Sequence, residues 1–409
     1  MDEKLLAEKL FFSKEAAEYL GITVQRLNKL IKENKIKPLK KNASGTVFYL
    51  DELKRRKEEL EIFTKINDGG ENGMFVLNTK VKREALNYAT LMNILNYTER
   101  KLEPLFKEFS NSVNVGIPMI DESVCDEYVK FFQVEKSNLL KEYNKAYEAF
   151  TALRETDEIV KRGNNDYPQL LAQTEQAPRF LYIRGKKSLL YETRTVALVG
   201  SRQASERARL NTRRLAISLG KNGITIISGL AKGIDVTAHK AALDNGYNTI
   251  AVIGTNLNQY YPSENKDVQI EIEKRGLVVS QFSPATKTER WFFPLRNGVM
   301  SGLSLATVIM EAGETSGALR QADFALKQGR QIMIPESALK ISSITWPAKY
   351  VDRGAQVVKN AKDVLKNLAE NNIFDINNKI SNVQQSFDDY LKSYDDKNVE
   401  WISHILDEV

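Results

Sequence analysis

The sequence predicts an α/β fold built on a doubly wound parallel sheet. A helix-turn-helix unit and a mostly helical section precede this sheet in the 409-residue chain. Two observations predict the sheet. Short, nearly unbroken runs of β-branched residues recur from about residue 164 onward, and helical patterns lie between most of them. A parallel strand is covered on both faces, so its sequence is apolar throughout instead of alternating.

Six apolar runs are the expected strands. They read "TVALVG", "ITIISG", "TIAVIG", "GLVVSQ", "ATVIMEAG" and "RQIMIP" in chain order. We assign residues 164–369 to a Rossmann-like domain on this alternation of strands and helices. Residues 370–409 are expected to form one or two helices on a polar tail.

Residues 1–65 are predicted to be a separate small unit. Ser13 is expected to cap a short helix that Gly21 ends, and Thr23 to cap a second helix. Leu27, Leu30 and Ile31 recur at helical spacing in that second helix. Two short helices around a glycine-containing turn form a helix-turn-helix pattern.

The stretch "KIKPLKKNASGTVFYLDELKRRKEEL" continues this unit with a polar turn, a short β run and a charged helix. It resembles the winged helix-turn-helix of the MerR and excisionase families. The resemblance implies contact with duplex DNA, and packing against another protein is the alternative. The residues expected to face outward on the second helix are Gln25, Arg26, Asn28 and Lys29.

The segment between these two parts has a different amino-acid composition. "INDGGENG", residues 66–73, is a linker by composition. Residues 74–160 are rich in Leu, Lys, Glu, Asn and Tyr, and we expect a mostly helical domain to which the sequence assigns no role.

Composition excludes several classes of protein. Cys125 is the only cysteine, and His239 and His404 are the only histidines, so no disulfide framework, metal site or cofactor is expected and a cytoplasmic location is predicted. The chain has no apolar run long enough for a membrane span, and "MDEKLLAEKL" lacks a signal region. A net charge of +6 permits a nucleic-acid partner without requiring one.

Small and polar residues follow several of the expected strands. In a parallel sheet these turns share one edge, where ligands bind and helix N-termini offer free N–H groups. Glycines allow close approach, and one cation per turn would complete a phosphate site. The residues are Gly200, Ser201 and Arg202; Ser228, Gly229, Lys232 and Gly233; Gly254 and Thr255; and Gly313, Thr315, Ser316 and Gly317.

The turns do not match known nucleotide-binding patterns. Gly229 and Gly233 have three residues between them, so the dinucleotide fingerprint is absent, and the P-loop pattern is absent as well. We also find no catalytic carboxylate pair, nucleophile triad or metal cluster. We therefore predict a protein that is not an enzyme.

The order of motifs resembles that of the DNA-processing protein A family over residues 166–358. The motifs are "VALVGSRQAS", "IISGLAKGIDVTAHKAAL", "TIAVIGTNLNQYYPSEN", "FPLRNGVMSGLS" and "EAGETSGALRQADFALKQGRQIMIP". The resemblance implies an extended Rossmann fold that binds single-stranded DNA without sequence preference. It also implies a homodimer, and the loading of a RecA-type recombinase during natural transformation.

The resemblance also assigns residues. It places Arg202 and Lys232 on DNA phosphates, and Tyr260, Tyr261 and Lys266 beside the same groove. An exposed tyrosine could stack on a base or only pack the loop. Arg296 and Asn297 stand in the motif "RNGV", and we expect His239 to bond Asp235 or a loop carbonyl.

Three departures from the family bear on the partners. Gly298 replaces the second arginine of the family's "RNRI", Ser280-Gln281 replaces "SE", and "SGALRQ" replaces "SGSLIT". These substitutions bear on the implied recombinase loading and on the implied dimer surface more than on the fold. Defence against foreign DNA is therefore an alternative to transformation.

Two other classes of function stay open at the sequence level. One is a nucleotide-derived small-molecule sensor or a phosphoribohydrolase-like enzyme, whose "PGGxGTxxE" signature has its nearest match in "EAGETSGALRQA", without the glutamate. The other is a transcription regulator that uses the winged helix and dimerises through the Rossmann-like domain.

Overall fold

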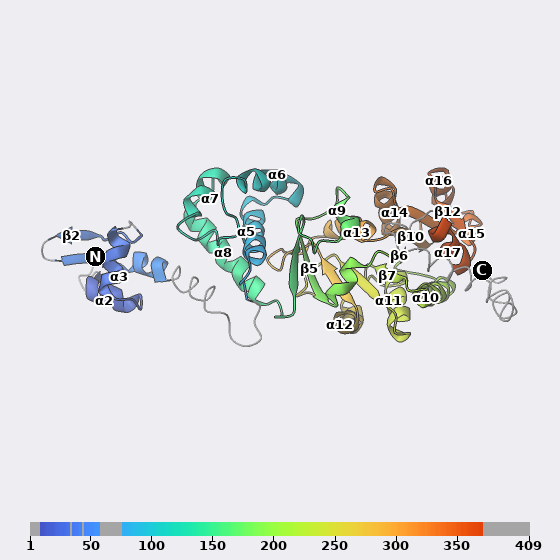
Figure 1. Cartoon of the computed structure of the whole chain (residues 1–409), viewed down its shortest axis with the longest axis horizontal. Coiled ribbons are helices and arrows are strands. Elements are labelled where there is room, and N and C mark those ends of the chain that lie inside the picture. Colours follow the sequence, from blue (N-terminus) through green and yellow to red (C-terminus); the bar gives the residue numbers. More distant parts are fainter. Residues whose placement is uncertain (1–8, 33–34, 43–44, 58–75, 371–409) are drawn as a thin grey trace.

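The computed structural model describes residues 9–32, 35–42, 45–57 and 76–370 (Figure 1). The polar tail expected over 370–409 and the linker at 66–73 therefore lie outside the described residues, except for Glu370. Within this part of the chain, no helix is both long and apolar enough to cross a bilayer.

The centre of the described structure is a sheet in the order β12-β11-β10-β6-β7-β8-β9-β5-β4. The six predicted strands are confirmed, and β12 extends the parallel part of the sheet. The parallel strands are β6 (Thr195–Gly200), β7 (Thr225–Ser228), β8 (Thr249–Ile253), β9 (Leu277–Ser280), β10 (Ala306–Glu311), β11 (Gln331–Pro335) and β12 (Gln356–Val358).

The chain reverses its direction of winding at the centre of this sheet. It runs outward from β6 to β9 and then returns to the opposite side of β6 to form β10. The point between β6 and β10 is a topological switch point. Doubly wound sheets bind their ligands there, outside the carboxyl ends of the strands.

One edge of the sheet is antiparallel. Strand β5 (Phe180–Gly185) pairs with β9, and β4 (Glu158–Lys161) pairs with β5. Neither strand is among those predicted from the sequence, and β4 is only four residues long with a charged residue at each end. The sheet therefore begins at residue 158, ahead of the boundary expected at 164.

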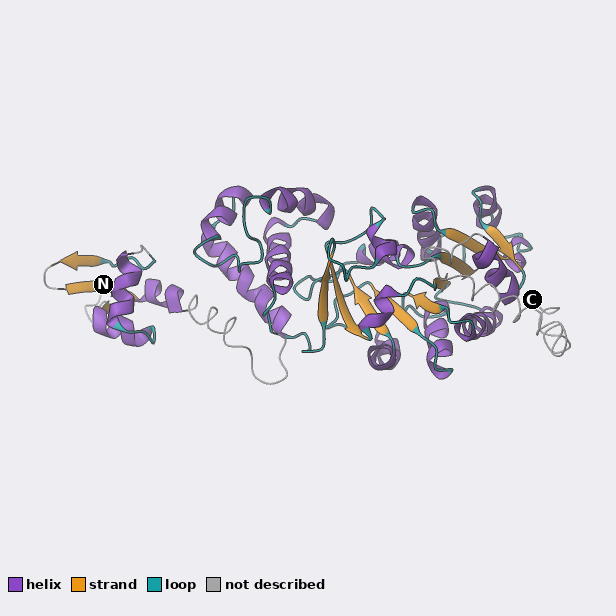
Figure 2. Ribbon diagram, viewed as in Figure 1, coloured by secondary structure: helices purple, strands orange, loops and turns teal. Residues whose placement is uncertain are grey.

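Helices cover both faces of the sheet (Figure 2). Buried side chains place α10 (Glu206–Lys221), α11 (Ile234–Asp244), α12 (Lys266–Arg275) and α17 (Ala361–Glu370) on one face. The opposite face carries α9 (Gln169–Ala172), α13 (Phe292–Gly302), α14 (Gly317–Lys327), α15 (Glu336–Leu339) and α16 (Trp346–Asp352). The doubly wound α/β prediction is confirmed.

The helical section packs directly on the sheet. It consists of α5 (Lys80–Leu95), α6 (Glu99–Phe109), α7 (Cys125–Phe132) and α8 (Lys136–Thr151). The ring of Phe150 lies 6.1 Å from that of Tyr182 on β5, and the ring of Tyr88 lies 5.7 Å from that of Phe180. Since these aromatics belong to one continuous core, the section shares its interior with the α/β domain.

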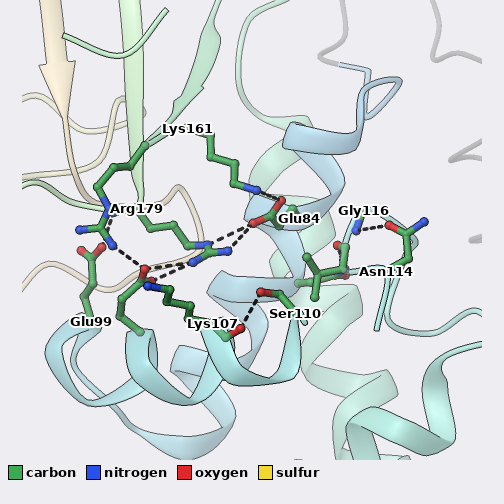
Figure 3. A network of polar contacts seen from close by, with 12 residues as sticks. Glu84, Glu99, Lys107, Ser110, Asn114, Gly116, Lys161 and Arg179 are labelled. Atoms are coloured by element: carbon green, nitrogen blue, oxygen red, sulfur yellow. Dashed lines mark hydrogen bonds and ion pairs between the residues drawn. The ribbon is translucent and has the colours of Figure 1, made fainter. Parts of the chain in front are cut away.

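A buried ion network joins the same two parts (Figure 3). The guanidinium of Arg179 lies 2.8 Å from a carboxylate oxygen of Glu84 on α5 and 3.0 Å from one of Glu103 on α6. Lys161 of β4 binds the other oxygen of Glu84 at 2.6 Å. Burial raises the pKa of nearby Glu99 to about 7. Because removing one member would leave a buried charge unpaired, the network fixes how α5 and α6 dock on the sheet edge.

The N-terminal unit has its own core. It contains β1 (Leu10–Phe12), α2 (Ser13–Tyr19), α3 (Val24–Lys32), β2 (Lys40–Asn42) and β3 (Gly45–Tyr49). The strands form a sheet in the order β1-β3-β2, and Leu27 and Phe48 are buried in the core. Arg56 reaches the helical section through an ion pair of 2.8 Å with Glu122.

The helix caps of this unit match the prediction in part. Thr23 caps α3 as predicted, since its hydroxyl accepts from the N–H of Arg26 at 3.2 Å. The prediction that Ser13 caps α2 is wrong, because Ser13 is already helical and Phe12 precedes it as the cap. The carboxylate of Glu15 accepts a hydrogen bond from the N–H of Phe12 at 2.9 Å. A side chain of the first helical turn therefore bonds the backbone N–H at the start of α2.

Candidate nucleic-acid interface

The turns after β6, β7 and β10 are joined by backbone hydrogen bonds. Ser201 donates its N–H to the carbonyl of Glu311 at 2.7 Å, and Ile234 donates to the carbonyl of Ser201 at 3.2 Å. Gly233 has φ +76°, and a Cβ there would lie 2.2 Å from the carbonyl oxygen of Ser201. Only glycine suits this position. The structure therefore brings the predicted "VGSRQ" and "SGLAKG" turns together at the switch point.

Arg202 is the exposed cation of this edge. Its side chain has neither an ion-pair partner nor a hydrogen-bond partner among the described residues. Burial lowers the pKa of Arg296 to about 10, and the positive charge of Arg202 contributes to this lowering. The guanidinium of Arg202 is therefore available for a ligand from solvent.

Lys232 differs from the free point charge that the sequence suggests. It forms an ion pair with Glu264, a residue of the loop after β8, and both side chains are largely exposed. This hydrogen bond from Lys232 lowers the pKa of Glu264. A phosphate that binds Lys232 must therefore compete with a carboxylate.

Exposed aromatic side chains lie along the same edge. Tyr261, in the loop after β8, is 50% exposed, and its ring lies 5.1 Å from that of Phe293. Trp291, at the start of α13, is 46% exposed. The sequence analysis did not select Trp291, although an aromatic run "RWFF" after a polar loop is a signal that could have identified it.

Gly254 makes room for one of these rings. A Cβ at this position would lie 2.5 Å from the ring of Phe293. The glycine therefore allows α13 to pack closely on β8, where the sequence suggested close approach of a ligand. Tyr260 and Lys266 lie at the side of the helical section, where the Tyr260 hydroxyl accepts from Arg154 at 3.0 Å and Lys266 lies 5.3 Å from the Tyr260 ring.

Three predicted contact residues lie behind the surface. Arg296 is only 5% exposed and donates to the carbonyls of Gly229 and Val252. The amide of Asn297 donates to the carbonyl of Gly317 at 3.3 Å, and Ser228 donates to that of Leu198 at 2.6 Å. These side chains hold the turns in place from the interior. A direct contact between them and a ligand stays a prediction.

The buried histidine is a structural residue. Its Nδ1 lies 2.7 Å from the hydroxyl of Thr249, which itself donates to the carbonyl of Ile226. The partner of Nδ1 is therefore a β8 side chain and not Asp235. Burial lowers the pKa of His239 to about 3 and raises the pKa of Asp235.

The N-terminus of α14 completes the edge. The hydroxyl of Ser316 caps this helix by accepting from the N–H of Ala318 at 3.3 Å. Gly317 is exposed, and a Cβ there would meet no atom within 4 Å. An anion could approach the free N–H groups of this first turn.

The acidic side chains beside these turns are already bonded. Glu311 accepts from the N–H and the hydroxyl of Ser205 at 2.9 and 2.6 Å, and Glu314 accepts from the N–H of Trp346 at 3.1 Å. Both carboxylates therefore cap helix starts. In residues 9–57 and 76–370, apart from the undescribed gaps, no group of three His, Cys, Asp or Glu side chains could hold a metal ion.

The predicted outward face of α3 lies in solvent. Its exposed residues are Gln25, Arg26, Asn28 and Lys29, whereas Leu27 and Leu30 are buried. The helix therefore presents polar and cationic side chains, as the helix-turn-helix interpretation requires.

Comparison with known proteins places this fold in a family. The chain is 33% identical over 291 residues to DNA processing protein DprA of Streptococcus pneumoniae. The match covers 70% of this chain and 95% of that protein. It is 36% identical to Protein Smf of Escherichia coli over 202 residues, 49% of this chain and 54% of that protein. The crystal structure of the S. pneumoniae protein matches with a TM-score of 0.56 and 27% identity, over 70% of this chain and 97% of that one. The sequence model of DNA recombination-mediator protein A matches residues 158–369. The chain therefore belongs to the DNA recombination-mediator protein A family.

Proposed function

We propose that this protein binds single-stranded DNA without sequence preference at the carboxyl edge of its parallel sheet. The observation that carries the proposal is the row of side chains on that edge. Arg202 follows β6, Tyr261 follows β8 and Trp291 begins the helix that follows β9, and all three are exposed.

A single strand suits this combination better than a duplex. Its bases have open faces that stack on aromatic side chains, and its phosphates attract a planar guanidinium. Stacking needs no particular base, and a phosphate carries no sequence information. The family and the DNA-processing names of its relatives support DNA as the ligand.

The alternatives have less support from the site. Glu311 and Glu314 cap helices, so a hydrolase would need to release one of them before it could act on a nucleotide. We therefore propose a binding protein. A RecA-type recombinase and a second copy of the chain are the partners that we propose from the resemblance, with DNA uptake in transformation as the process.

A second candidate function is contact with duplex DNA by the N-terminal unit. The exposed α3 face with Arg26 and Lys29, and the exposed Lys40 and Lys41 of β2, favour it. Two adjacent cationic elements of this kind suit the phosphates that flank a groove.

A salt titration of fluorescence anisotropy with a labelled oligothymidine tests the first proposal. Binding to single strands should show a log–log salt slope of about −0.7 for each phosphate neutralised. Arg202→Ala should flatten the slope by about 0.7, and the loss should be equal across base sequences. Tyr261→Ala and Trp291→Ala should weaken binding by about 1–3 kcal/mol per stacked base and leave the slope unchanged.

The ion pair of Lys232 gives a more specific test. Glu264→Gln should strengthen binding at low salt, because Lys232 no longer pairs with a carboxylate. Glu271→Gln breaks a comparable exposed pair with Lys274 on α12 and is the matched control. If folded Arg202→Ala binds like the wild type at every salt concentration, the site is elsewhere.

A further inference from the structure

The arginines of this chain are concentrated beside the proposed site. The chain has 21 arginines and 38 lysines, and five of the arginines lie within residues 202–214. Arg202 ends the turn after β6, and the other four lie on α10, which begins at Glu206. Helix α10 carries one acidic residue, Glu206, against five cations. A helix face whose only role is contact with solvent usually carries both acidic and basic residues.

Helical geometry sorts these cations into two groups. The side of α10 that packs on the sheet includes Ala208, Leu215 and Leu219. Arg207, Arg214 and Lys221 recur every seven residues and are exposed, so they form one row in solvent with steps of about 10 Å. The row spans about 21 Å. We refer to these three residues as the α10 row.

Arg209 and Arg213, which lie outside the α10 row, are bonded within the protein. Arg213 pairs with Asp244 of α11 at 3.0 Å, and Arg209 donates to the carbonyl of Ala204 at 2.7 Å. Arg213 therefore lies on the side of α10 that faces α11. Among the described residues, Arg214 and Lys221 have no carboxylate partner.

The row begins where the proposed site ends. Arg202 stands three residues before Ser205, the cap of α10, and the helix then runs from the carboxyl edge of the sheet toward its amino edge. Helix α17 packs beside α10 and carries the exposed Lys362 and Lys366, of which Lys366 pairs with Glu370 at 3.5 Å. A strand that leaves Arg202 along this face would meet cations for the full length of the helix.

We propose that the α10 row guides single-stranded DNA, by phosphate contacts alone, away from the strand-end site, by which we mean the exposed Arg202, Tyr261 and Trp291. This inference rests on the proposed function, because the row is continuous with Arg202. A stacked strand advances 3.4 Å per nucleotide, so a path of about 21 Å holds roughly six nucleotides. The row carries no exposed aromatic side chain, so it holds the backbone and leaves the bases free.

The test compares oligothymidines of 6 and 20 nucleotides on the full chain by anisotropy over a range of salt concentrations. The triple variant Arg207→Gln, Arg214→Gln, Lys221→Gln should weaken binding of the 20-mer several-fold. Its salt slope should flatten by about 2, which corresponds to three phosphates at about 0.7 each. Binding of the 6-mer, which is too short to occupy the strand-end site and the whole row together, should weaken much less than binding of the 20-mer.

Two matched variants separate this effect from the loss of three charges. Lys107→Gln, Lys130→Gln, Lys327→Gln removes the same charge from exposed positions on α6, α7 and α14, and it should leave both oligonucleotides unaffected. Arg207→Lys, Arg214→Lys keeps the charge and should retain most of the wild-type slope for the 20-mer. Circular dichroism and thermal unfolding confirm that each variant is folded.

The outcomes distinguish the two proposals. If the α10 triple variant binds the 20-mer like the wild type, or loses no more than the control triple, the row is not a DNA path. A loss confined to a 20-base-pair duplex would also overturn it, since the row would then serve duplex DNA. If the 6-mer does not respond to Arg202→Ala, the strand-end site itself is wrong, whatever the 20-mer does.

Discussion

At the residue scale, Gly229 makes room for the buried guanidinium of Arg296. A Cβ at this position would lie 2.1 Å from Nη1 of Arg296 and 2.4 Å from its Cζ. The buried guanidinium would have to move, and it would lose its bonds to the carbonyls of Gly229 and Val252. Gly229→Ala should therefore lower the free energy of unfolding by roughly 2–4 kcal/mol in urea denaturation.

Gly317 provides the control for this prediction. A Cβ there meets no atom within 4 Å, so Gly317→Ala should change the free energy of unfolding by less than about 0.5 kcal/mol. Equal stability of the two variants would show that Arg296 can move out of the way of a new side chain at no cost.

At the element scale, His239 joins helix α11 to strand β8 through Thr249. Its pKa is about 3 in the folded protein because of burial, against an ordinary value of 6.5. Between these values the unfolded chain binds more protons, so the free energy of unfolding falls as the pH drops below about 6.5. The histidine accounts for up to about 1.4 kcal/mol per pH unit.

Urea denaturation between pH 4 and 7 measures this dependence. Asp235 acts in the opposite sense, because its pKa is raised, so the comparison must be with His239→Gln under identical conditions. The variant should lose stability overall but show a shallower decline toward low pH than the wild type. Parallel curves for the two proteins would mean that this histidine titrates normally in the folded state.

At the scale of the whole molecule, the N-terminal unit and the rest of the chain have separate cores. Helices α2 and α3 pack around Leu27 and Phe48, whereas residues 76–370 form their own cores. Two ion pairs cross this division, from Arg56 and from Lys35 to Glu122. Deleting residues 1–65 should therefore weaken duplex binding about tenfold or more and spare the binding of single strands.

A gel-shift comparison of duplex and single-stranded DNA measures this effect, and a point variant refines it. Arg26→Gln on the exposed face of α3 should weaken duplex binding, whereas Lys54→Gln, an exposed cation of the same unit, should not. Undiminished duplex affinity after the deletion would assign duplex contact to the α/β domain.

The parallel sheet and the location of its candidate site could both be predicted from the amino-acid sequence. Strands buried on both faces must be apolar throughout, so β6 to β11 can be recognised in the sequence as runs of apolar residues. The carboxyl ends of parallel strands necessarily share one edge of the sheet. Arg202 could be selected from the sequence because a cation immediately after such a strand must lie at that edge. The short edge strand β4 lacks this signal, since an edge strand is covered less completely and carries charges.

Which of the site's charges face solvent could not be predicted from the sequence and became visible in the folded chain. Lys232 pairs with a glutamate 32 residues away, and Arg296 bonds two carbonyls that lie 67 and 44 residues before it. The core that joins the helical section to β5, β8, β9 and α12 is likewise assembled from distant segments. The physical reason is that burial and pairing depend on which turns meet in space, and a local pattern of residues contains no information about partners so far along the chain.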